Sequence, residues 1–425
     1  MRVWLITIGE PLPIDGTNER LHRTGTLANM LVKRGHKIIW WTSTFDHIRK
    51  RQRFDSDKTI KQSNNFKIRL LNSIRYKKNI SIFRFINHYL IGYKFYKYTQ
   101  EELKPDIILS SLPTLKLSLS AVKYGKKMNI PVVLDMRDMW PEVFLDFIPS
   151  WARSIANILF LPMYTMLNRA CINATCITGI TQGFVEWGVN CANRSAANFD
   201  RYFPFGYSEK TPEEKEIKEA EQFWLKYGLT KNSNEFNICF FGNLGHSFIP
   251  EFINVINAAR KIKNKNYPIR FIICGSGVNL DYYKKMSRDC NNIIFPGWIN
   301  RDQIWTLLRM SSIGLLPYQN VKSFVISLPN KSIEYLSAGL PIVSSLKGVL
   351  GDLLNNFNCG TTYESGNADD LASTLINLFN HPELLKEMSK NAYTLYQDKF
   401  VAEKVYSNMI DYLELVVKNY KKQCI

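Results

Sequence analysis

Short apolar runs alternate with longer amphipathic stretches from one end of the chain to the other. This alternation is typical of parallel β-α-β units, because their strands are buried on both faces whereas each connecting helix is apolar on one side only. A helix is predicted over Asn18–Arg34, where leucines recur near helical spacing and Gly35 ends the pattern. The runs of the first half predict strands at Arg2–Thr7, Lys37–Thr42, Phe66–Leu71, Asp106–Ser110, Pro131–Met136 and Cys176–Thr181. A doubly wound α/β domain is expected there.

A Glu- and Lys-rich stretch, Ser208–Leu229, reads as an exposed helix and separates this half from a second series of apolar runs. That series predicts strands at Phe236–Phe241, Ile269–Cys274, Asn292–Phe295, Ile313–Pro317, Pro341–Ser344 and Gly360–Tyr363, and the tail Asp369–Lys422 has an almost wholly helical pattern. The expected domains are residues 1–208 and 209–398, with a helix in 399–425 that returns to the first domain. Two α/β domains of similar size create a cleft between the carboxyl ends of their sheets, where such folds bind ligands.

The charge of the chain is strongly positive and unevenly placed. Its 55 Lys and Arg residues exceed its 37 Asp and Glu residues by 18. Residues 1–210 account for +15 of this excess, and Arg49–Lys97 alone holds 14 bases and two acids among many aromatic residues. Such a mixture suits an anionic membrane surface or a nucleic acid, and a solvated basic face is the alternative.

The composition indicates a cytoplasmic protein. Its eight cysteines lack metal-ligand spacing, and several lie within apolar runs, where a thiol behaves as a small hydrophobe. The N-terminus reads as a first strand, so no signal peptide is expected. The longest apolar stretch, Ile155–Leu167, contains Pro162 and is shorter than the roughly 20 residues that span a bilayer. Any membrane contact is therefore expected to be peripheral.

The most informative segment is SLPNKSIEYLSAGLPIVSS, at 327–345. Pro329 precedes a short helix that Gly339 ends, and the free N–H groups at such a helix start suit a phosphate. Lys331 supplies a cation in the first turn, and Glu334 lies on the same face, placed to accept a hydrogen bond from a ribose. An ordinary surface pair of Lys331 and Glu334 is the alternative.

This arrangement resembles the donor site of retaining glycosyltransferases of family four, which have the GT-B fold of two Rossmann-like doubly wound domains facing each other across a cleft. The resemblance extends over nearly the whole chain. It implies that Glu334 binds the ribose of the nucleotide. The family usually has a second Glu eight residues earlier, where this chain has Ile326, so the resemblance implies that loop amides from Val325 through Ile326 and Ser327 to Leu328 contact the donor sugar instead.

Other glycine-rich turns agree with this resemblance. FFGNLGHSF, at 240–248, ends a strand with Gly242, Asn243 and Gly245, where glycine permits close approach of the backbone to a diphosphate. FIICGSGVNL, at 271–280, places Gly275 after the next strand but lacks the third glycine of a dinucleotide fingerprint, which argues against a nicotinamide enzyme. The family also implies that the backbone at Trp298 and Ile299 holds the base, although by residue type Trp298 suits a hydrophobic core. His246 is as consistent with a surface turn as with a ligand.

In the first half, the strand PVVLDM runs into RDMWPEVF, at 137–144. Charged side chains at the end of a buried strand are costly unless they face a cleft, which favours a functional role. The segment resembles the Arg-Asp-x-Trp-Pro-Glu signature of bacterial surface-polysaccharide glycosyltransferases. By that resemblance Asp138 binds or deprotonates the acceptor hydroxyl, Arg137 orients it or the leaving diphosphate, and Glu142 is a second carboxylate near the turn.

The first β-α loop, GEPLPIDGTNERLHR, matches the family's glycine loop in position. Gly16 would then approach the donor phosphates and Arg20 an anion, and a plain helix start capped by Thr17 is the alternative.

The function expected from the resemblance is retaining transfer of a sugar from a nucleotide diphosphate donor, with UDP favoured, to a polyprenyl-diphosphate-linked saccharide in surface-polysaccharide or O-antigen assembly. Retention places the main demand on stabilising the departing diphosphate. Metal and cofactor independence are expected. The enzyme is expected at the inner face of the plasma membrane, held through Arg49–Lys97. A nucleotide-sugar 2-epimerase of the same fold is one alternative. A nucleic-acid-binding protein is a more distant one, which no recognition motif supports.

Overall fold

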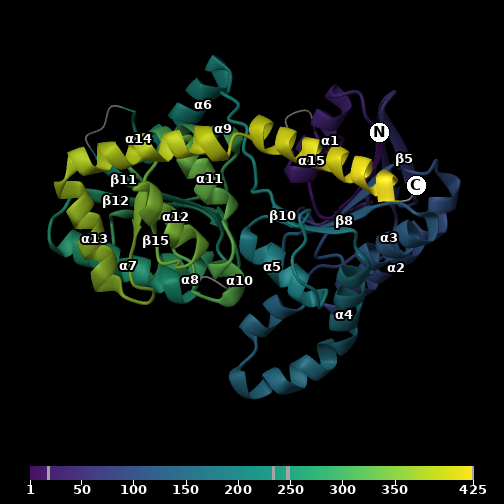
Figure 1. The fold of residues 1–425 in the computed structure, drawn as a ribbon. Coiled ribbons are helices and arrows are strands. Elements are labelled where there is room, and N and C mark those ends of the chain that lie inside the picture. The colour runs from purple at the N-terminus through teal and green to yellow at the C-terminus, as the bar shows by residue number, and fades with distance from the viewer. Residues whose placement is uncertain (17–19, 232–234, 246–248, 424–425) are drawn as a thin grey trace. The chain divides into compact units, whose positions relative to one another are not determined.

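A computed structural model describes residues 1–16, 20–231, 235–245 and 249–423 of the chain. The chain forms two compact units, of which unit 1 comprises Met1–Gly206 with Ala402–Ile425 and unit 2 comprises Tyr207–Val401. The domain boundaries expected from the sequence were residues 208 and 398. Figure 1 labels the elements along the chain.

Unit 1 is built on an eight-stranded sheet in the order β10-β9-β8-β7-β1-β2-β6-β5. Its strands are β1 (Arg2–Ile6), β2 (Lys37–Ser43), β5 (Lys58–Ser63), β6 (Phe66–Leu71), β7 (Ile107–Ser111), β8 (Val132–Met136), β9 (Cys176–Gly179) and β10 (Arg201–Tyr202). All neighbours are parallel except β5, which pairs antiparallel with β6 and is a strand that the apolar pattern did not predict. The chain leaves β1 first towards β2 and β6 and then returns to β7 on the other side, which is the Rossmann order.

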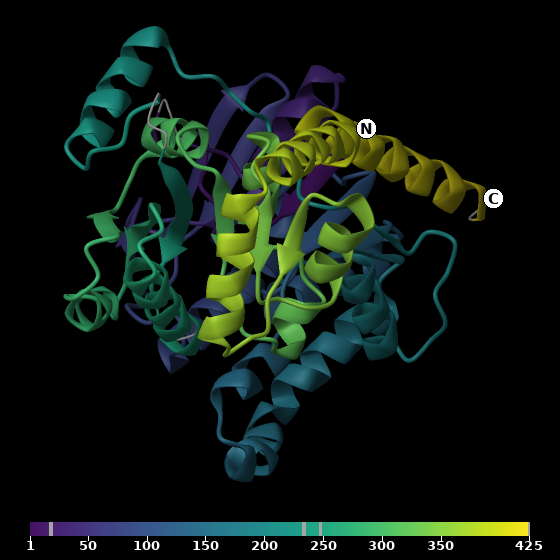
Figure 2. The ribbon, with the colours of Figure 1, turned by 90° about the vertical axis from the view of Figure 1, so that its left-hand side faces the viewer.

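Helices cover both faces of this sheet. They are α1 (Arg23–Lys33), α2 (Ile82–Tyr98), α3 (Leu115–Met128), α4 (Arg153–Asn173), α5 (Gln182–Cys191) and α15 (Ala402–Gln423), with short 3₁₀ turns at Thr99–Glu101, Glu142–Phe147 and Ser150–Ala152. The remaining strands, β3 (Phe45–Asp46) and β4 (Arg51–Gln52), form a separate two-stranded sheet. α1 and α15 pack together on one face, whereas α2, α3, α4 and α5 follow one another on the other (Figures 1 and 2).

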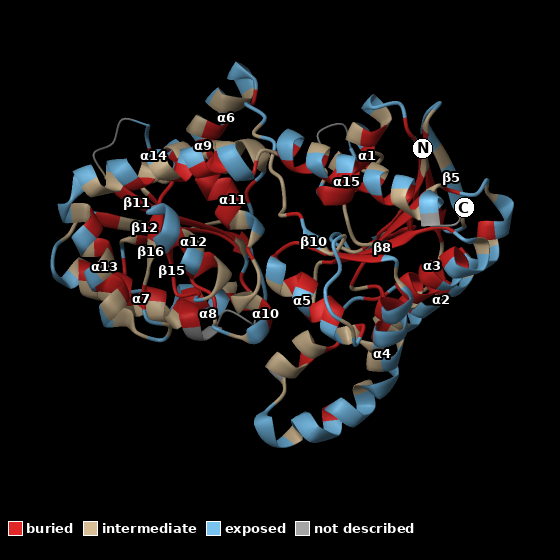
Figure 3. Ribbon diagram, in the orientation of Figure 1, coloured by how far each residue is buried: buried red, intermediate tan, exposed pale blue. Residues whose placement is uncertain are grey.

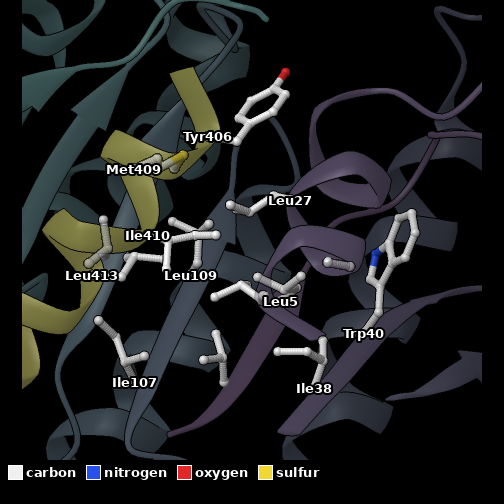
Figure 4. Packing of buried hydrophobic residues seen from close by; sticks show 14 of the residues in the cluster. Leu5, Leu27, Ile38, Trp40, Ile107, Leu109, Tyr406, Met409, Ile410 and Leu413 are labelled. Atoms are coloured by element: carbon white, nitrogen blue, oxygen red, sulfur yellow. The ribbon is translucent and has the colours of Figure 1, made fainter. Parts of the chain in front are cut away.

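Alternate residues of β1 serve the two faces. Leu5 packs with Leu27 of α1 and Met409 of α15 in the core shown in Figure 4. Trp4 points to the other face, where its ring lies 5.2 Å from that of Trp41 and is stacked on Tyr124 of α3. Because residues of a strand alternate in direction, a central parallel strand needs large apolar side chains at every position.

Unit 2 contains a six-stranded, fully parallel sheet in the order β13-β12-β11-β14-β15-β16. Its strands are β11 (Phe236–Asn243), β12 (Ile269–Ser276), β13 (Ile293–Gly297), β14 (Ile313–Leu316), β15 (Ile342–Ser344) and β16 (Gly360–Thr362). Its helices are α6 (Glu214–Leu225), α7 (Ile249–Asn264), α8 (Leu280–Met286), α9 (Arg301–Arg309), α10 (Lys322–Val325), α11 (Asn330–Ser337), α12 (Val349–Phe357), α13 (Ala368–Asn380) and α14 (Pro382–Lys399). The strand order is again that of a doubly wound sheet, with its switch point between β11 and β14.

Three local expectations need correction. α1 begins at Arg23 rather than Asn18, because the backbone of His22 is extended, with φ −88° and ψ −165°. Asn18 and the suggested cap Thr17 lie outside the described residues. β9 ends at Gly179 because the Thr181 side chain instead caps α5, accepting the amide of Phe184 at 3.4 Å.

The third correction concerns the apolar stretch at Ile155–Leu167. It belongs to a continuous helical segment, Ser150–Asn173, which by length and composition is long and apolar enough to cross a membrane. Pro162 does not end this helix. Its position is exposed, so water can satisfy the backbone carbonyl that the missing N–H leaves unpaired.

Candidate functional site

In unit 2, Lys331 lies directly against the carboxyl end of β11. A Cβ atom placed on Gly242 would come within 2.4 Å of the Lys331 Cε atom, and a Cβ on Gly275 would come within 1.8 Å of the Gly242 carbonyl oxygen. Gly242 and Gly275 have φ of +154° and +135°, a region that side chains disfavour. Glycine is therefore required at both positions for β11, β12 and α11 to meet at the switch point of the sheet.

The position of Lys331 follows from how α11 is anchored. Tyr335, one turn further on, is fully buried, and its hydroxyl lies within hydrogen-bond distance of the carbonyl oxygens of Cys239 on β11 and Leu315 on β14. Gly314 makes room for the Tyr335 ring, since a Cβ there would approach it to 2.3 Å. The first turn of α11 is thereby held over the carboxyl ends of these two strands.

The environment of Lys331 leaves its charge available. Its Nζ atom donates to the Tyr318 hydroxyl at 3.4 Å and lies 5.6 Å from the centre of the Phe240 ring. Among the described residues no carboxylate forms an ion pair with it. A cation beside the free amides of a helix start and a glycine turn is an arrangement that binds phosphate groups.

Glu334 lies three residues further along α11 and is 4% exposed. The backbone carbonyl of Glu334 accepts a hydrogen bond from the Ser337 hydroxyl at 2.8 Å. A buried side chain does not fit the alternative of an exposed surface pair with Lys331. The ribose contact expected for Glu334 stays a prediction.

The loop before α11 differs from the expectation. The amide of Ile326 already donates to the Lys322 carbonyl at 3.3 Å, and that of Ser327 to the Phe324 carbonyl at 3.0 Å, because this stretch ends the short helix α10. Both amides are therefore already bonded in this structure, and the sugar contact expected through Ile326, Ser327 and Leu328 stays a prediction. For the Leu328 amide, no backbone partner is found in the part of the chain that the structure describes.

Trp298 and Ile299 follow the carboxyl end of β13, on the same edge of the sheet. Trp298 is 73% exposed, so it does not close a hydrophobic core as its residue type suggested. Ile299 is buried, and Asn300 then caps α9, accepting the Gln303 amide at 2.9 Å. Asn243 is the last residue of β11, and Gly245 follows on this edge, where a Cβ atom would lie 3.3 Å from Asn243 Oδ1. His246 lies outside the described residues.

In unit 1, Arg137 is part of a buried ion-pair network. Its Nε donates to Asp135 Oδ2 at 2.6 Å, and its two terminal nitrogens contact Glu10 and the Thr24 hydroxyl. Arg23 forms a second, bidentate pair with Asp135, at 3.0 Å for each nitrogen. Burial alone would lower the pKa of Arg137 and raise that of Asp135, but the opposite charges outweigh burial and shift both pKa values the other way.

This network changes the interpretation of Arg137. Its guanidinium is held by protein groups on all sides and joins the end of β8 to the start of α1. We therefore assign it a positioning role for the segment that follows, and an acceptor contact by Arg137 stays a prediction.

Asp138 is the next residue, and it is held differently. Its carboxylate accepts the Met139 amide at 2.9 Å and the Trp140 indole N–H at 3.2 Å, and it is partly exposed. Burial raises the pKa of Asp138 to about 6, despite these hydrogen bonds and the nearby charge of Arg84, which lower it. A carboxyl with such a pKa can exchange a proton near neutral pH.

A cluster of basic and aromatic side chains adjoins Asp138, and sequence reasoning did not single out its members. The Arg84 guanidinium lies 4.4 Å above the Trp140 ring, and its Nε is buried with no hydrogen-bond partner among the described residues. His88 stacks on Trp140, with ring centres 5.4 Å apart. Burial, followed by the charge of Arg84, lowers the pKa of His88 and also that of Lys50, the latter to about 8.

Burial is the main cause of these lowered pKa values, and the charge of Arg84 adds a repulsion that a bound anion would relieve. The one signal in the sequence was the basic and aromatic composition of Arg49–Lys97. Because Arg84 lies 54 positions before Asp138 in the chain, spacing could not connect the two.

The other candidates in unit 1 are less closely tied to Asp138. Glu142 accepts the indole N–H of Trp187 at 2.8 Å, so it fastens the turn to α5. Gly16 has open space where a side chain would be, and Arg20 is exposed on the same loop. Among the described residues no group of three or more His, Cys, Asp and Glu side chains could hold a metal ion.

Comparisons with known proteins bear on both units. Residues 225–395 match the family described as glycosyl transferases group 1, a match that lies within unit 2. Sucrose-phosphate synthase from Thermosynechococcus elongatus superposes with a TM-score of 0.71 at 14% identity, covering 98% of this chain and 99% of that one. The protein is a glycosyltransferase of the GT-B fold.

Two further solved structures resemble this glycosyltransferase over its length. A glycosyltransferase from Rickettsia africae gives a TM-score of 0.62 at 16% identity, covering 98% of this chain and 99% of that one. HepE of Anabaena, solved with UDP and glucose, gives 0.63 at 12% identity, covering 97% and 99%. At these identities the structures define the fold of the glycosyltransferase and not its substrates. The search of curated proteins found no match.

Proposed function

We propose that this glycosyltransferase moves a sugar, with retention of configuration, from a nucleotide diphosphate donor to a lipid-linked saccharide in surface-polysaccharide assembly. The observation that carries the donor half of the proposal is the ammonium of Lys331 at the switch point of the unit 2 sheet, against Gly242, which in turn packs against Gly275. Switch points of doubly wound sheets are where such folds bind nucleotides. UDP is the favoured nucleotide, supported by its presence in HepE.

Under this proposal Lys331 and the start of α11 stabilise the diphosphate as it departs. The bond between the sugar anomeric carbon and the diphosphate oxygen breaks, and the acceptor oxygen forms a bond to the same carbon on the same face. The acceptor proton passes to the departing diphosphate oxygen. Positive charge and oriented amides at that oxygen lower the barrier because negative charge develops there.

Asp138 and Arg84 support an acceptor site in unit 1. Asp138 accepts a hydrogen bond from the acceptor hydroxyl and holds it for attack, while Arg84 suits the phosphate of a lipid-linked saccharide. The buried Nε of Arg84, without a described partner, is the group that such a phosphate would satisfy.

The anionic surface proposed for Arg49–Lys97 rests on part of that stretch. Arg53 is 8% exposed and pairs with Asp15, so it belongs to the interior of unit 1. Lys94 pairs with Asp57 at 2.9 Å. Lys77 and Lys78 are exposed and adjoin the start of α2, which makes them the bases best placed to meet a membrane. Each base near an anionic surface contributes about 1 kcal/mol.

Product analysis separates this proposal from a 2-epimerase. The purified protein is incubated with a nucleotide sugar alone and the sugar is analysed by NMR. A transferase gives only slow release of the same sugar, whereas an epimerase inverts its C2 centre. Accumulation of the C2 epimer would refute the proposal, and sequence-dependent gel shifts with nucleic acid would favour the third alternative.

The donor itself is identified by thermal shift. A ligand that binds the folded state raises the melting temperature, by an amount set by its concentration relative to its dissociation constant. A panel of UDP, GDP and ADP sugars at equal concentration therefore ranks the bases. We expect a UDP sugar to give the largest shift, which Lys331→Met abolishes. Equal shifts for all nucleotides would contradict a defined base site.

A further inference from the structure

The 3₁₀ turn Ser150–Ala152 and the first half of α4 form an apolar arm that unit 1 leaves uncovered. We define the arm as residues 151–162. Figure 3 shows it pale blue, and both ribbon views show it leading away from the sheet of unit 1 (Figures 1 and 2). Ala156 is its one buried residue, whereas the large apolar side chains are exposed by 56–80%: Trp151, Ile155, Ile158, Leu159 and Leu161.

The exposed side chains of the arm lie mostly on one side. Trp151, Ile155 and Leu159 follow one another at intervals of four residues, which places them on one helix face. In a soluble monomer exposed apolar residues are normally scattered, and a contiguous apolar face marks an interaction surface.

This face continues into a pocket. Met163 and Met166 extend the same stripe and line a cavity of about 270 Å³ together with Phe85 and Ile86 of α2 and Trp140. Its lining is almost wholly apolar, apart from His88 and Lys116. The Trp140 indole forms one wall and donates its N–H to Asp138, so the apolar path ends beside the proposed acceptor carboxylate.

α2 adds a second exposed stripe at the rim of the pocket. Ile82, Ile86, Tyr89 and Tyr93 recur at helical spacing and are 41–69% exposed. Bases adjoin this surface: Lys116 lies 4.6 Å from the Tyr89 ring, and no Asp or Glu occurs between residues 147 and 185. An apolar surface with interfacial aromatic residues and an excess of bases is complementary to an anionic bilayer.

The arm is too short to cross a bilayer. From Leu167 onward α4 is anchored in unit 1, with Leu167, Ala170 and Cys171 fully buried. At 1.5 Å per residue the 12 residues of the arm extend about 18 Å, compared with a hydrocarbon thickness of about 30 Å. The arm therefore suits insertion into the interfacial region of one leaflet.

We propose that the arm and the pocket form one hydrocarbon-binding surface, which seats unit 1 on an anionic bilayer and receives the isoprenoid chain of the acceptor next to Asp138. This inference deepens the proposed function, on which its acceptor part rests. The chain would enter from the bilayer along the Ile155–Leu159 face, and its phosphate would reach Arg84 above Trp140.

The bilayer contact is tested by sedimentation with vesicles of phosphatidylglycerol and phosphatidylcholine, and of phosphatidylcholine alone. The variant carries Ile155→Gln and Leu159→Gln, and the matched control Ile172→Gln alters an exposed apolar residue of the same helix outside the arm. Each apolar side chain that inserts changes the partition constant by about tenfold, so we expect the double variant to bind about a hundredfold more weakly. The control should bind like the wild type, and circular dichroism should show both variants folded.

Binding to anionic vesicles by the double variant at the wild-type level would overturn the bilayer contact. The bilayer contact would also be overturned if the wild type failed to bind vesicles and sedimented as a dimer while the double variant sedimented as a monomer. A second chain would then cover the arm. High salt should weaken but not abolish wild-type binding, because salt screens the bases but not the apolar contact.

The pocket is tested with farnesyl diphosphate and inorganic diphosphate as probes, followed by calorimetry. We expect farnesyl diphosphate to bind at least tenfold more tightly, and Met163→Gln to remove that difference. Equal affinity of the wild type for both probes would refute the chain site. Transfer to water-soluble saccharides in preference to lipid-linked ones would refute the proposed acceptor. The vesicle and probe results would still stand in that case, so failure of the proposed function can be told apart from failure of the hydrocarbon-binding surface.

Discussion

Asp138→Asn is expected to make unit 1 more stable above neutral pH while it impairs transfer. The pKa of Asp138 is raised from 3.8 to about 6, mainly by burial. A carboxyl whose pKa is higher in the folded than in the unfolded state favours folding when protonated. This contribution is fully present below pH 3.8 and is lost as pH rises through about 6. Above that pH the folded protein carries the cost of a desolvated charge.

The magnitude follows from the shift. A rise from 3.8 to about 6 corresponds to roughly 3 kcal/mol, which we reduce to about 2 kcal/mol because Asp138 is partly exposed. Asparagine keeps one acceptor, for the Met139 amide, and loses the one that faces the Trp140 N–H, at a cost of about 1 kcal/mol. The variant should therefore gain about 1 kcal/mol at pH 8 and be about 1 kcal/mol less stable at pH 4.

Urea unfolding followed by tryptophan fluorescence from pH 4 to 8.5 measures this difference. The matched control is Glu186→Gln, which removes one negative charge from an exposed position of α5 in the same unit. We expect the difference in unfolding free energy between Asp138→Asn and the wild type to change by about 2 kcal/mol across this range, and that of the control to stay nearly constant. Parallel curves for Asp138→Asn and the wild type would show that the carboxyl is not desolvated.

Three further changes test other parts of the structure. Gly275→Ala should lower the unfolding free energy of unit 2 by more than about 3 kcal/mol, because the new Cβ meets the neighbouring strand. Gly297→Ala has open space around the new Cβ and should cost only about 1 kcal/mol. Urea unfolding measures both values. Lys331→Met keeps the side-chain stem and removes the charge, so calorimetry should show UDP binding at least tenfold more weakly. The control Lys347→Met alters an exposed lysine and should bind UDP like the wild type. Equal UDP affinities of Lys331→Met and the wild type would exclude Lys331 from the diphosphate site. Arg137→Met leaves Glu10 without its cation and should cost about 3 kcal/mol in unfolding free energy, and an unchanged urea midpoint would contradict the network.

Most strands of both sheets could be predicted from the sequence, because fully buried parallel strands are continuous apolar runs. The predicted run Lys37–Thr42 lies within β2, Lys37–Ser43. β5 was not predicted because it is an edge strand of mostly exposed polar residues. Its pairing with β6 depends on backbone hydrogen bonds and not on apolar side chains. Helix starts were less accurate, since side-chain caps such as Thr181 compete with strand continuation at the level of single hydrogen bonds.

The candidate donor site could be predicted in outline because its residues lie near one another in sequence and carry recognisable turn chemistry. The meeting of Lys331 with Gly242 could not, since it depends on strand order and the packing of Tyr335. In unit 1 the charged pair after β8 was recognised, but its division into a structural Arg137 and a titratable Asp138 depends on partners from other elements. The apolar stretch Ile155–Leu167 was recognised in the sequence, but its exposure could not be predicted, because exposure is a property of packing and not of composition.

The most direct test of the account is transfer by the purified enzyme from its nucleotide sugar to an isoprenyl-diphosphate saccharide in anionic vesicles. We expect the mass of the lipid-linked saccharide to increase by one glycosyl unit, with the anomeric configuration of the donor retained by NMR. Asp138→Asn should lower the rate at least a hundredfold while donor binding persists. Conversion of the donor without an acceptor, or a product of inverted configuration, would contradict the account.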